Sequence, residues 1–240
     1  MTASFPWYDL PSVQWANDAL WAATGLGGAL DRTTPIVDQW CCDDLLISQS
    51  CGLDLLICSA PIEPVLRPVF ALDAPPGEYF SYLVTGTAAQ SALTKGVGAV
   101  NSMSSHSGLV ALLELWMPEE FLLTGSHRAS IAAVREGSAE CAAIDAVVWH
   151  LLQRDAPEQL QGLRIVGRSD PGPAPPFVCR TGDRRFGKVL ARIVAMPDLQ
   201  PALDALLLRD LLDTTISTYQ PLFDRYERVR SAIPERLRLQ

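Results

Sequence analysis

The sequence predicts an α/β protein built from parallel βα units. Short apolar or β-branched runs alternate with amphipathic segments of about 10–15 residues along most of the chain. Several of the apolar runs end in small hydroxyl or acidic residues. Hydrophobic residues make up 48% of the 240-residue chain and charged residues 19%, which is enough to bury a substantial core. In open α/β sheets ligands bind beyond the carboxyl ends of the strands, so these polar ends are candidates for one shared site.

The expected elements follow one another along the chain. The first helix, 12–25, opens after Pro11 with apolar residues at helical spacing and stops at Gly25. The segment 78–86 is aromatic and β-branched, which is typical of a strand. The expected strands are 43–50, 78–86, 96–102, 121–126, 141–145, 163–169 and 177–180, and the expected helices after the first are 107–116, 127–137, 146–155, 186–196, 199–212 and 214–233.

Composition limits the partners of the chain. The net charge is −8, the pI is about 4.9, and no block of Lys and Arg occurs, which argues against nucleic acid and against a polybasic membrane patch. No segment approaches the ~20 apolar residues of a membrane span, so no membrane insertion is expected. The first basic residue is Arg32 and no signal-peptide pattern is present, so the chain as written is expected in the cytoplasm; it is periplasmic if a leader was removed.

No cofactor, metal site or catalytic residue is expected from the motifs. The six cysteines form no CxxC pair, and no HExxH occurs, so a zinc site is not indicated. Most of the cysteines lie in apolar runs and are expected to be buried reduced thiols, although their even number also allows disulfides. The glycines at 25–28 have no strand before them, and neither a P-loop nor a GxSxG elbow is present.

A serine-rich segment between an expected strand and an apolar helix is the strongest candidate for a binding site. It contains Ser104, Ser105, His106 and Ser107, followed by Gly108. A helix start has free N–H groups and a partial positive charge, so it stabilises an anion without Lys or Arg. The serines add hydroxyl donors, and the glycine allows close backbone approach. The alternative is a simple helix cap, which needs one serine only.

Two further strand ends belong to the same candidate site. Ser126 and His127 close one strand and open a helix; His127 is a possible proton donor to an oxyanion, or else a helix cap or core residue. Asp145 ends the strand 141–145, where it either caps the next helix or accepts a hydrogen bond from a protonated ligand group. Both interpretations of Asp145 stay open.

The first half of the chain supplies three more candidates. Ser48 and Gln49 end the expected strand 43–50, and they would contribute to the site if they face the serine-rich segment. Tyr8 could cover the ligand from the same side.

At these residues the sequence resembles the phosphate, phosphite and phosphonate substrate-binding proteins of ABC transporters, within the type II periplasmic-binding-protein superfamily. The segments that carry the resemblance are YDLP (8–11), LLISQSCG (45–52), GEYFSYLV (77–84), AVNSMSSHSGLVAL (99–112) and TGSHRASIAAVREGSAECAAIDAVVW (124–149). The resemblance implies two α/β lobes, each a mixed sheet flanked by helices, joined by two hinge strands near 81–85 and 175–179. Lobe 1 would hold 1–82 plus 179–240, and lobe 2 would hold 83–178.

The resemblance also implies roles for the candidates. The oxyanion would lie against Ser105, His106 and Ser107, with His127 contributing from the same lobe. Tyr8 would line the cleft from the other lobe, and Asp145 matches a strand end near the ligand. There are departures from the family pattern: His106 stands where a small hydroxyl residue is more usual, and the Leu-Asp pair at 53–54 replaces an aromatic–proline pair.

Two functions follow from this resemblance. The favoured one is a solute-binding protein that closes by hinge motion on phosphate, phosphite or a phosphonate-like anion, for an ABC transporter permease or as a soluble sensor. The alternative is a leaderless cytoplasmic enzyme on the same scaffold, resembling those of menaquinone or thiamine-pyrimidine biosynthesis. His106, His127 and Asp145 would then be acid–base candidates.

Overall fold

The computed structural model describes residues 1–87, 96–231, 233 and 235, and the chain divides into two compact units. Unit 1 consists of Met1–Glu78 and Pro173–Gln220, and unit 2 consists of Tyr79–Gly172 and Pro221–Gln240. Two of the boundaries fall inside short strands, β4 (Glu78–Tyr79) and β10 (Gly172–Pro173), which pair as a two-stranded sheet. The chain therefore leaves unit 1 at β4, returns at β10, and enters unit 2 again for its last helix.

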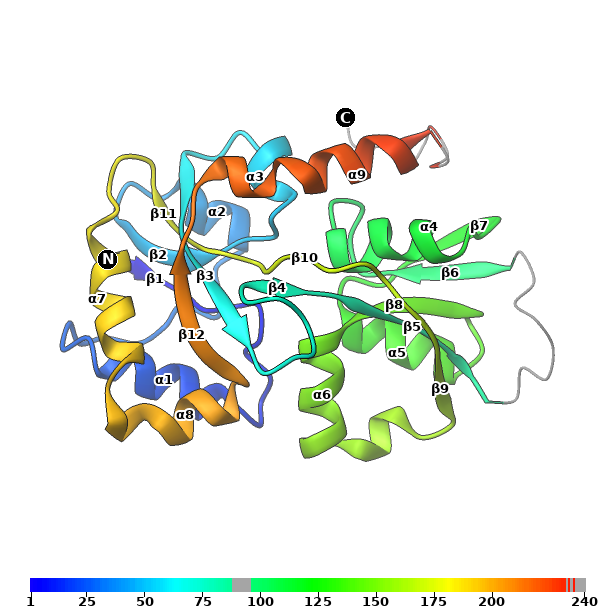
Figure 1. The fold of residues 1–240 in the computed structure, drawn as a ribbon, viewed down its shortest axis with the longest axis horizontal. Helices are drawn as coiled ribbons and strands as arrows, with labels where there is room; N and C mark the ends of the chain where they lie inside the picture. The colour runs from blue at the N-terminus through cyan, green and yellow to red at the C-terminus, as the bar shows by residue number, and fades with distance from the viewer. Residues whose placement is uncertain (88–95, 232, 234, 236–240) are drawn as a thin grey trace. The chain divides into compact units, whose positions relative to one another are not determined.

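Unit 1 is built on a five-stranded mixed sheet (Figure 1). In spatial order the strands are β1 (Thr2–Ala3), β2 (Leu45–Gln49), β11 (Phe177–Arg180), β3 (Ile62–Phe70) and β12 (Leu208–Asp213). The β1–β2 pair is parallel, and the β11–β2, β11–β3 and β12–β3 pairs are antiparallel. The helices of this unit are α1 (Gln14–Ala22), α2 (Ile36–Cys41), α3 (Asp54–Ile57), α7 (Arg185–Val194) and α8 (Gln200–Ala205), with 3₁₀ turns η3 (Pro197–Leu199) and η4 (Ile216–Tyr219).

Unit 2 has a second five-stranded sheet, flanked by helices (Figure 1). Its order is β7 (Glu120–Leu123), β6 (Val97–Val100), β8 (Cys141–Asp145), β5 (Ser81–Gly86) and β9 (Leu163–Arg168). Strand β6 runs parallel to both β7 and β8, and β5 runs antiparallel to β8 and β9. The helices are the π-helix η1 (His106–Val110), α4 (Ala111–Leu115), α5 (His127–Arg135), α6 (Ala146–Asp155), the 3₁₀ turn η2 (Pro157–Leu160) and α9 (Gln220–Arg230), which belongs to unit 2 from Pro221 onward.

Strand β8 explains why the sequence of unit 2 folds in this way. All five of its residues are buried, and Cys141, Ala142 and Ile144 have no exposed surface. A strand covered on both faces is a continuous apolar run rather than an alternating one. Because β6, β7 and β8 are parallel, their carboxyl ends meet at one edge of the sheet, and η1, α5 and α6 begin just after them.

The prediction of an α/β fold with mixed sheets is confirmed, but one element is wrong. The segment 199–212 was expected to be one helix. Helix α8 ends at Ala205, and the chain turns through Leu207, which has a φ of 56°, into strand β12. The apolar residues of β12 pair with β3, so tertiary pairing overrides the helical propensity of Leu and Ala. Strands β1, β3 and β10 and helices α2 and α3 were not predicted.

The division into units differs from the expected lobes by a few residues at the two strand crossings, which lie after Glu78 and Gly172, and most clearly at the C-terminus. The expected lobe 1 was 1–82 plus 179–240, and the expected lobe 2 was 83–178. In the structure the chain from Pro221 onward belongs with unit 2. The physical reason is Arg225, a buried side chain of α9 that pairs with Glu114 of α4.

The cysteines are all free, and three of the six are buried. Burial raises the pKa of the Cys179 thiol to about 12, which keeps it protonated and unreactive. Cys42 and Cys58 are half-buried and Cys41 is exposed, so half of the thiols, and not most of them as expected, lie in the core. Among the residues that the structure describes, none of the helices is both long enough and apolar enough to cross a membrane.

Candidate ligand-binding site

The serine-rich segment folds into a tight turn after β6 and then into a π-helix. Ser105 caps this helix, because its Oγ accepts a hydrogen bond from the Gly108 amide at 2.9 Å. The Ser105 carbonyl accepts from the amides of Leu109 at 3.0 Å and Val110 at 3.1 Å. This second bond spans five residues and makes the turn wider than an α-helical one. Such π-turns are rare and occur frequently at functional sites.

The start of this helix leaves two backbone donors unused. Within the described part of the chain, the amides of His106 and Ser107 donate no hydrogen bond. The helix η1 continues directly into α4, so the two run from His106 to Leu115 without a break. Free N–H groups and the helix dipole together favour a negative charge at this end.

Gly108 is required by the close packing of the turn. A Cβ atom at this position would lie 1.8 Å from Asn101 Oδ1, far inside van der Waals contact. The Asn101 oxygen is itself buried and, among the described residues, has no hydrogen-bond partner. A buried acceptor without a partner is unusual in a folded protein and needs an explanation.

A bond between two side chains joins the starts of η1 and α5. Ser107 Oγ and His127 Nε2 lie 3.0 Å apart. Burial lowers the pKa of His127 to about 4, while the nearby backbone of Ala143 acts in the opposite direction. The imidazole is therefore neutral at pH 7. The two residues belong to different strand ends, so the bond brings two of the predicted segments into one place.

His106 lies in a more deeply buried position than His127. Its side chain is 2% exposed, and its Nδ1 lies 3.4 Å from the Tyr79 hydroxyl. Burial, followed by the nearby positive charge of Arg225, lowers the pKa of His106 to about 3. Its Nε2 is buried without a hydrogen-bond partner in the described ranges. His106 is thus a neutral residue of the interior and not a charged anion ligand.

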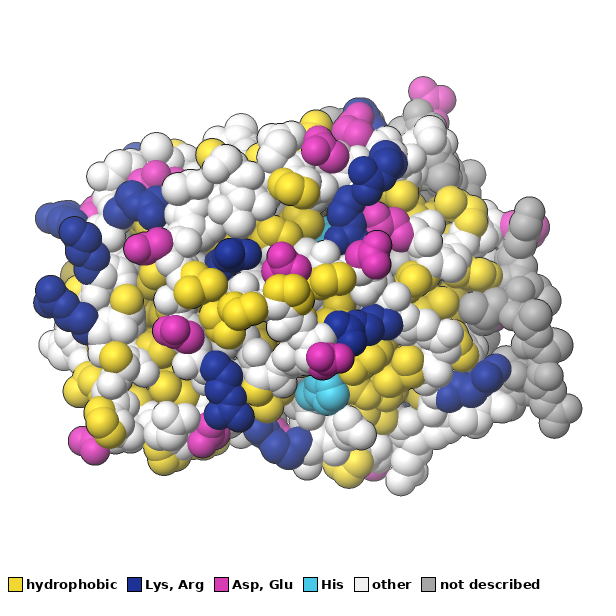
Figure 2. All heavy atoms as spheres, viewed as in Figure 1, with side chains coloured by type: hydrophobic (Ala, Val, Ile, Leu, Met, Phe, Trp, Pro, Cys, Tyr) yellow, Lys and Arg dark blue, Asp and Glu magenta, His cyan; other side chains and the backbone are white. Residues whose placement is uncertain are grey.

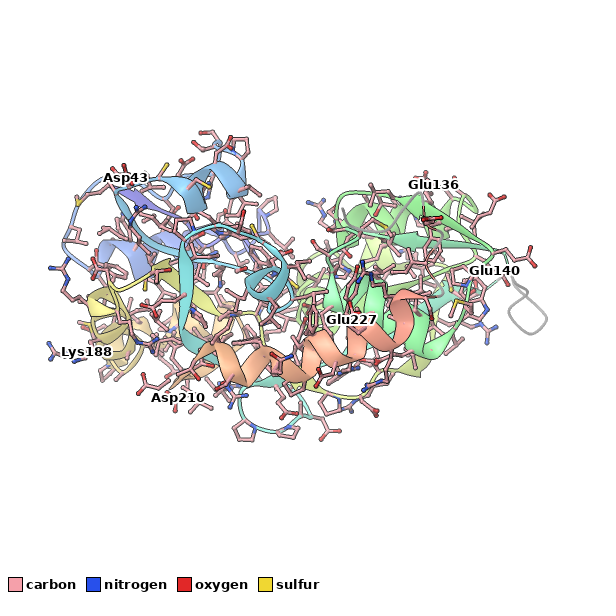
Figure 3. The ribbon with its side chains drawn as sticks, turned by 90° about the horizontal axis from the view of Figure 1, so that it is seen from above. Asp43, Glu136, Glu140, Lys188, Asp210 and Glu227 are labelled. Atoms are coloured by element: carbon pink, nitrogen blue, oxygen red, sulfur yellow. The ribbon has the colours of Figure 1, made fainter. Side chains whose placement is uncertain are left out.

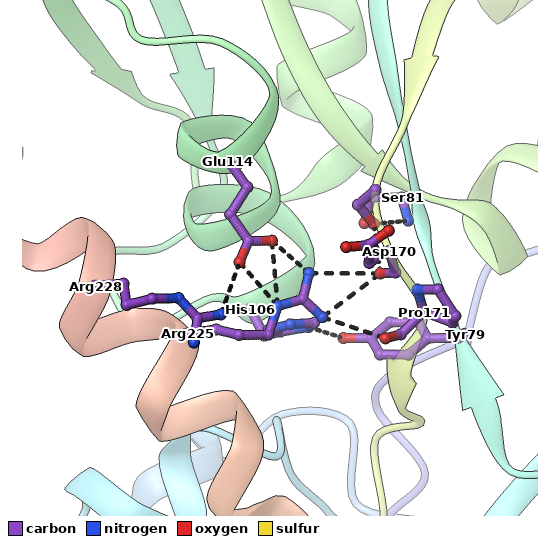
Figure 4. A network of polar contacts seen from close by, with 9 residues as sticks. Tyr79, Ser81, His106, Glu114, Asp170, Pro171, Arg225 and Arg228 are labelled. Carbon is purple, nitrogen blue, oxygen red and sulfur yellow. Dashed lines mark hydrogen bonds and ion pairs between the residues drawn. The ribbon is translucent and has the colours of Figure 1, made fainter.

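Next to His106, a half-buried ion pair ties the helix to two other segments of unit 2 (Figure 4). Arg225 Nε donates to Glu114 Oε1 at 2.9 Å and to Oε2 at 3.2 Å, and Arg225 Nη2 donates to Glu114 Oε2 as well. The same guanidinium donates to the carbonyls of Asp170 and Pro171. Arg228 adds a weaker contact to Glu114 at 3.9 Å. Helix α9 is thereby fastened to α4 and to the chain that leads into β10.

The other predicted residues of unit 2 have roles in helix capping or in the turn. Ser104 is bonded through its hydroxyl to Ser102 at 3.0 Å. Ser126 caps α5, since its Oγ accepts from the Ala129 amide at 3.1 Å. Asp145, which is 2% exposed, accepts from the amides of Val147 and Val148 at 2.7 and 3.4 Å, which is the capping interpretation of this residue.

The three candidates of unit 1 are buried and have partners there. Ser48 has no exposed surface and bonds to Ser4 Oγ at 2.8 Å. Gln49 Oε1 accepts from the Trp7 amide at 3.0 Å. The Tyr8 ring packs edge-on against Phe70, with the centroids 5.1 Å apart.

Sequence reasoning missed three residues of this region: Tyr79, Glu114 and Arg225. Tyr79 lies inside a segment that carries the family resemblance, so it could have been singled out as a polar residue at a strand start. Glu114 and Arg225 are 111 positions apart in the chain, and each is one charge on an amphipathic helix. No local signal distinguishes them from solvated charges.

Comparison with models of protein families identifies the family to which the chain belongs. Residues 101–221, half of the chain, match the family of ABC transporter, phosphonate, periplasmic substrate-binding proteins. The chain belongs to this family. The match begins at Asn101, so it includes the serine-rich turn, the His127 helix start and the Asp145 strand end. No curated protein sequence matches the chain.

Solved structures show the same fold at low sequence identity. A binding protein component of an ABC phosphonate transporter from Pseudomonas aeruginosa superposes with a TM-score of 0.79 at 15% identity, over 97% of this chain and 87% of that one. PhnD1 from Prochlorococcus marinus, solved with methylphosphonate, gives 0.76 at 14% identity over 96% and 98%. A Xanthomonas citri protein bound to chloride gives 0.69 at 16% identity over 97% and 99%; it was also solved with ATP. This phosphonate-type solute-binding protein therefore has the type II periplasmic-binding-protein fold.

Proposed function

We propose that this solute-binding protein takes up a small phosphorus oxyanion of the phosphonate class, held at the start of helix η1 in unit 2. The observation that carries the proposal is the pair of unused amides of His106 and Ser107. They belong to one continuous helix, and their dipoles add to those of the turns behind them. A phosphonate oxygen placed there receives two backbone hydrogen bonds without a cationic side chain.

The Ser107–His127 pair is the proposed side-chain contribution. Ser107 Oγ already bonds to His127 Nε2, and it retains further hydrogen-bonding capacity for a ligand oxygen. Because the His127 ring is neutral, this pair offers dipoles rather than a full charge. Charge-assisted hydrogen bonds contribute about 1.5–3 kcal/mol each, so three or four of them support micromolar binding, about 8 kcal/mol, after ordering costs.

The remaining predicted residues are proposed in supporting roles. Ser104, Ser105, Ser126 and Asp145 shape or cap the strand ends of unit 2, and we propose that they position the ligand-binding backbone. Within unit 1, Tyr8, Ser48 and Gln49 are proposed separately as ligand-contacting residues. An ABC transporter permease is the proposed partner, and the periplasm is the proposed location, in line with the family description.

The relatives support the ligand class. The Prochlorococcus marinus protein was solved with methylphosphonate, and the family is described as phosphonate-binding. The Xanthomonas citri protein was solved with chloride and with ATP, so proteins of this fold take other anions too. A panel of anions is therefore needed to test the proposal.

The test is thermal unfolding with methylphosphonate, aminoethylphosphonate, phosphite, phosphate, sulfate and acetate. A ligand at 100 times its Kd adds about 2.7 kcal/mol, which for a chain of this size raises Tm by roughly 5–11 °C. We expect such a shift with phosphorus oxyanions and none with acetate. The variant Ser107→Ala should lose most of the shift, while Ser138→Ala, an exposed serine of the same unit, should keep it. No shift with any anion of phosphorus would contradict the ligand class, and a full shift in Ser107→Ala would contradict the site.

A further inference from the structure

A cluster of basic side chains on helix α7 of unit 1 plays no part in the proposed site. Arg184, Arg185, Lys188 and Arg192, together with Val189, line a surface hollow of about 360 Å³. Four basic residues within nine positions are a local concentration in a chain of net charge −8. Figure 2 shows basic side chains gathered over α7, and Figure 3 shows Lys188 pointing away from the ribbon.

The charges of this cluster are only partly neutralised. Arg185 pairs with Asp183 at 2.8 Å. Arg184 is held by the carbonyls of Pro64 at 2.8 Å and Thr214 at 3.0 Å, and its nearest carboxylate, Glu63, is 3.9 Å away. This anchoring fixes the guanidinium in place while leaving most of its charge unpaired.

The two outer residues carry the remaining charge. Lys188 and Arg192 are exposed, and in the described part of the chain neither forms an ion pair or a side-chain hydrogen bond. Even a paired charge at an exposed position contributes little to stability, so these two unpaired charges do not stabilise the fold. Their effect is a positive electrostatic potential outside this surface, which attracts negatively charged partners.

The spacing of the cluster is regular. Lys188 and Arg192 are four residues apart on α7, so they lie on one side of the helix about 6 Å apart, and Arg184, the residue before the helix start, is four positions before Lys188. The opposite side packs into the core through Phe186, Leu190 and neighbouring apolar residues. The backbone positions of this row of three basic residues therefore span about 12 Å along α7 and its start, with Arg185 beside them.

We propose that this row, which we call the α7 basic row, docks an acidic α-helical segment of a partner protein. A helix with carboxylates at every fourth position presents negative charges at the same step of about 6 Å. The basic residues recur every four positions along the chain, so their backbone spacing matches a rod of regularly spaced charges. Charge complementarity of this kind gives specificity and a fast association rate more than affinity.

Nucleic acid and anionic membrane are less suitable partners. Both carry extended negative surfaces, and the net charge of −8 on the protein repels them outside the row. A single acidic helix is small enough to contact the α7 basic row without contacting the acidic surface around it. The inference is independent of the oxyanion site, because every residue of the row lies in unit 1 and the proposed oxyanion-binding amides lie in unit 2.

The experiment uses the full-length protein and a fluorescein-labelled, Ala-based helical peptide. The peptide has about 15 residues, the length at which such helices become stable, with three Glu residues spaced four apart. A control peptide has the same composition with the three Glu residues adjacent to one another. Binding is followed by fluorescence anisotropy at about 0.05 and 0.5 M salt, because screening weakens contacts between exposed charges.

We expect the spaced peptide to bind the wild type at low salt and to be released at high salt. The variant Lys188→Glu/Arg192→Glu should bind it at least about tenfold more weakly, since two attractions become repulsions. Arg209→Glu, an exposed basic residue of the same unit, should change the affinity by less than about twofold. Ligand-induced thermal shifts with methylphosphonate should be equal in all these variants.

Three results would overturn the proposal. The first is no binding of the spaced peptide at about 1 mM. The second is equal binding by the double variant or equal binding of the two peptides. The third is binding of tripolyphosphate, duplex DNA or vesicles of anionic lipid through Lys188 and Arg192 when the peptide does not bind, which would assign the row to a different class of anion.

Discussion

Removing the carboxylate of Glu114 should destabilise unit 2 more than removing its cationic partner. In Glu114→Leu, the Arg225 side chain, which is 10% exposed in the wild type, loses its bidentate carboxylate partner. Breaking a buried pair costs about 3–5 kcal/mol, and the retained carbonyl bonds to Asp170 and Pro171 reduce this to about 2–3 kcal/mol. In Arg225→Met, Glu114 is 23% exposed and still faces Arg228, so about 1–2 kcal/mol is expected.

The double variant supplies the decisive comparison. Leu and Met together replace the ion pair by apolar side chains, so the double variant should lose no more than about 2 kcal/mol. The coupling energy between the two positions is then at least about 1 kcal/mol. The exposed pair of Arg209 and Asp204 is the matched control, and Arg209→Met should cost less than about 0.5 kcal/mol.

The measurement is urea unfolding followed by circular dichroism and by fluorescence, with Trp149 as a buried reporter in unit 2. A loss of about 2–3 kcal/mol corresponds to a fall in Tm of roughly 4–12 °C for a chain of this length. Strictly additive effects of the two substitutions, or a Glu114→Leu variant as stable as the wild type, would refute the argument that Arg225 is a buried charge in need of its partner.

Three further predictions concern the candidate site. His106 is neutral in the folded state, because its pKa is about 3 there and about 6.5 in the unfolded chain. The free energy of unfolding should therefore fall as the pH drops below about 7, by about 2 kcal/mol between pH 7 and pH 5. The variant His106→Gln should lose this part of the pH dependence when unfolding by urea is measured at several pH values. Gly108→Ala forces Asn101 out of contact and should cost about 1–3 kcal/mol, whereas Gly86→Ala, whose Cβ would meet nothing closer than 3.9 Å, should be nearly neutral in the same assay. Asp145→Ala removes the cap of α6 and should lower the free energy of unfolding by about 1 kcal/mol, whereas Asp145→Asn keeps a capping oxygen and should be more stable than the Ala variant. Ligand affinity of Asp145→Asn is then measured by calorimetry. An unchanged affinity would show that the carboxylate charge has no role in binding.

The strand ends of unit 2 could be predicted from the sequence because the patterns that mark them involve residues close together in the chain. An apolar run such as 141–145 followed by an amphipathic helix predicts a strand, a turn and a helix start in that order, and the polar residue between them must lie at the junction. Ser105, Ser126 and Asp145 are all helix caps in the structure, as short polar side chains at such junctions commonly are.

The misread segment 199–212 shows where local signals fail. Its Leu-rich sequence suits a helix and a strand equally, and the choice was made by β3, about 140 positions earlier in the chain, which offers an unpaired edge to β12. The assignment of the last helix to unit 2 also depends on a segment far away in the chain. Its amphipathic pattern predicts α9, but only the pairing of Arg225 with Glu114 assigns it to unit 2.

The sequence by itself determined the α/β class, most of the strands and helices, the family and the turn at which a ligand is expected. Each of these depends on residues close together in the chain. Only the tertiary structure decided that His106 is a neutral core residue, that Ser107 and His127 share a bond, and that Arg225 pairs with Glu114 of α4. Burial and long-range pairing decide the charge state and the free donors of a side chain, and both arise from contacts between segments that are far apart in the sequence.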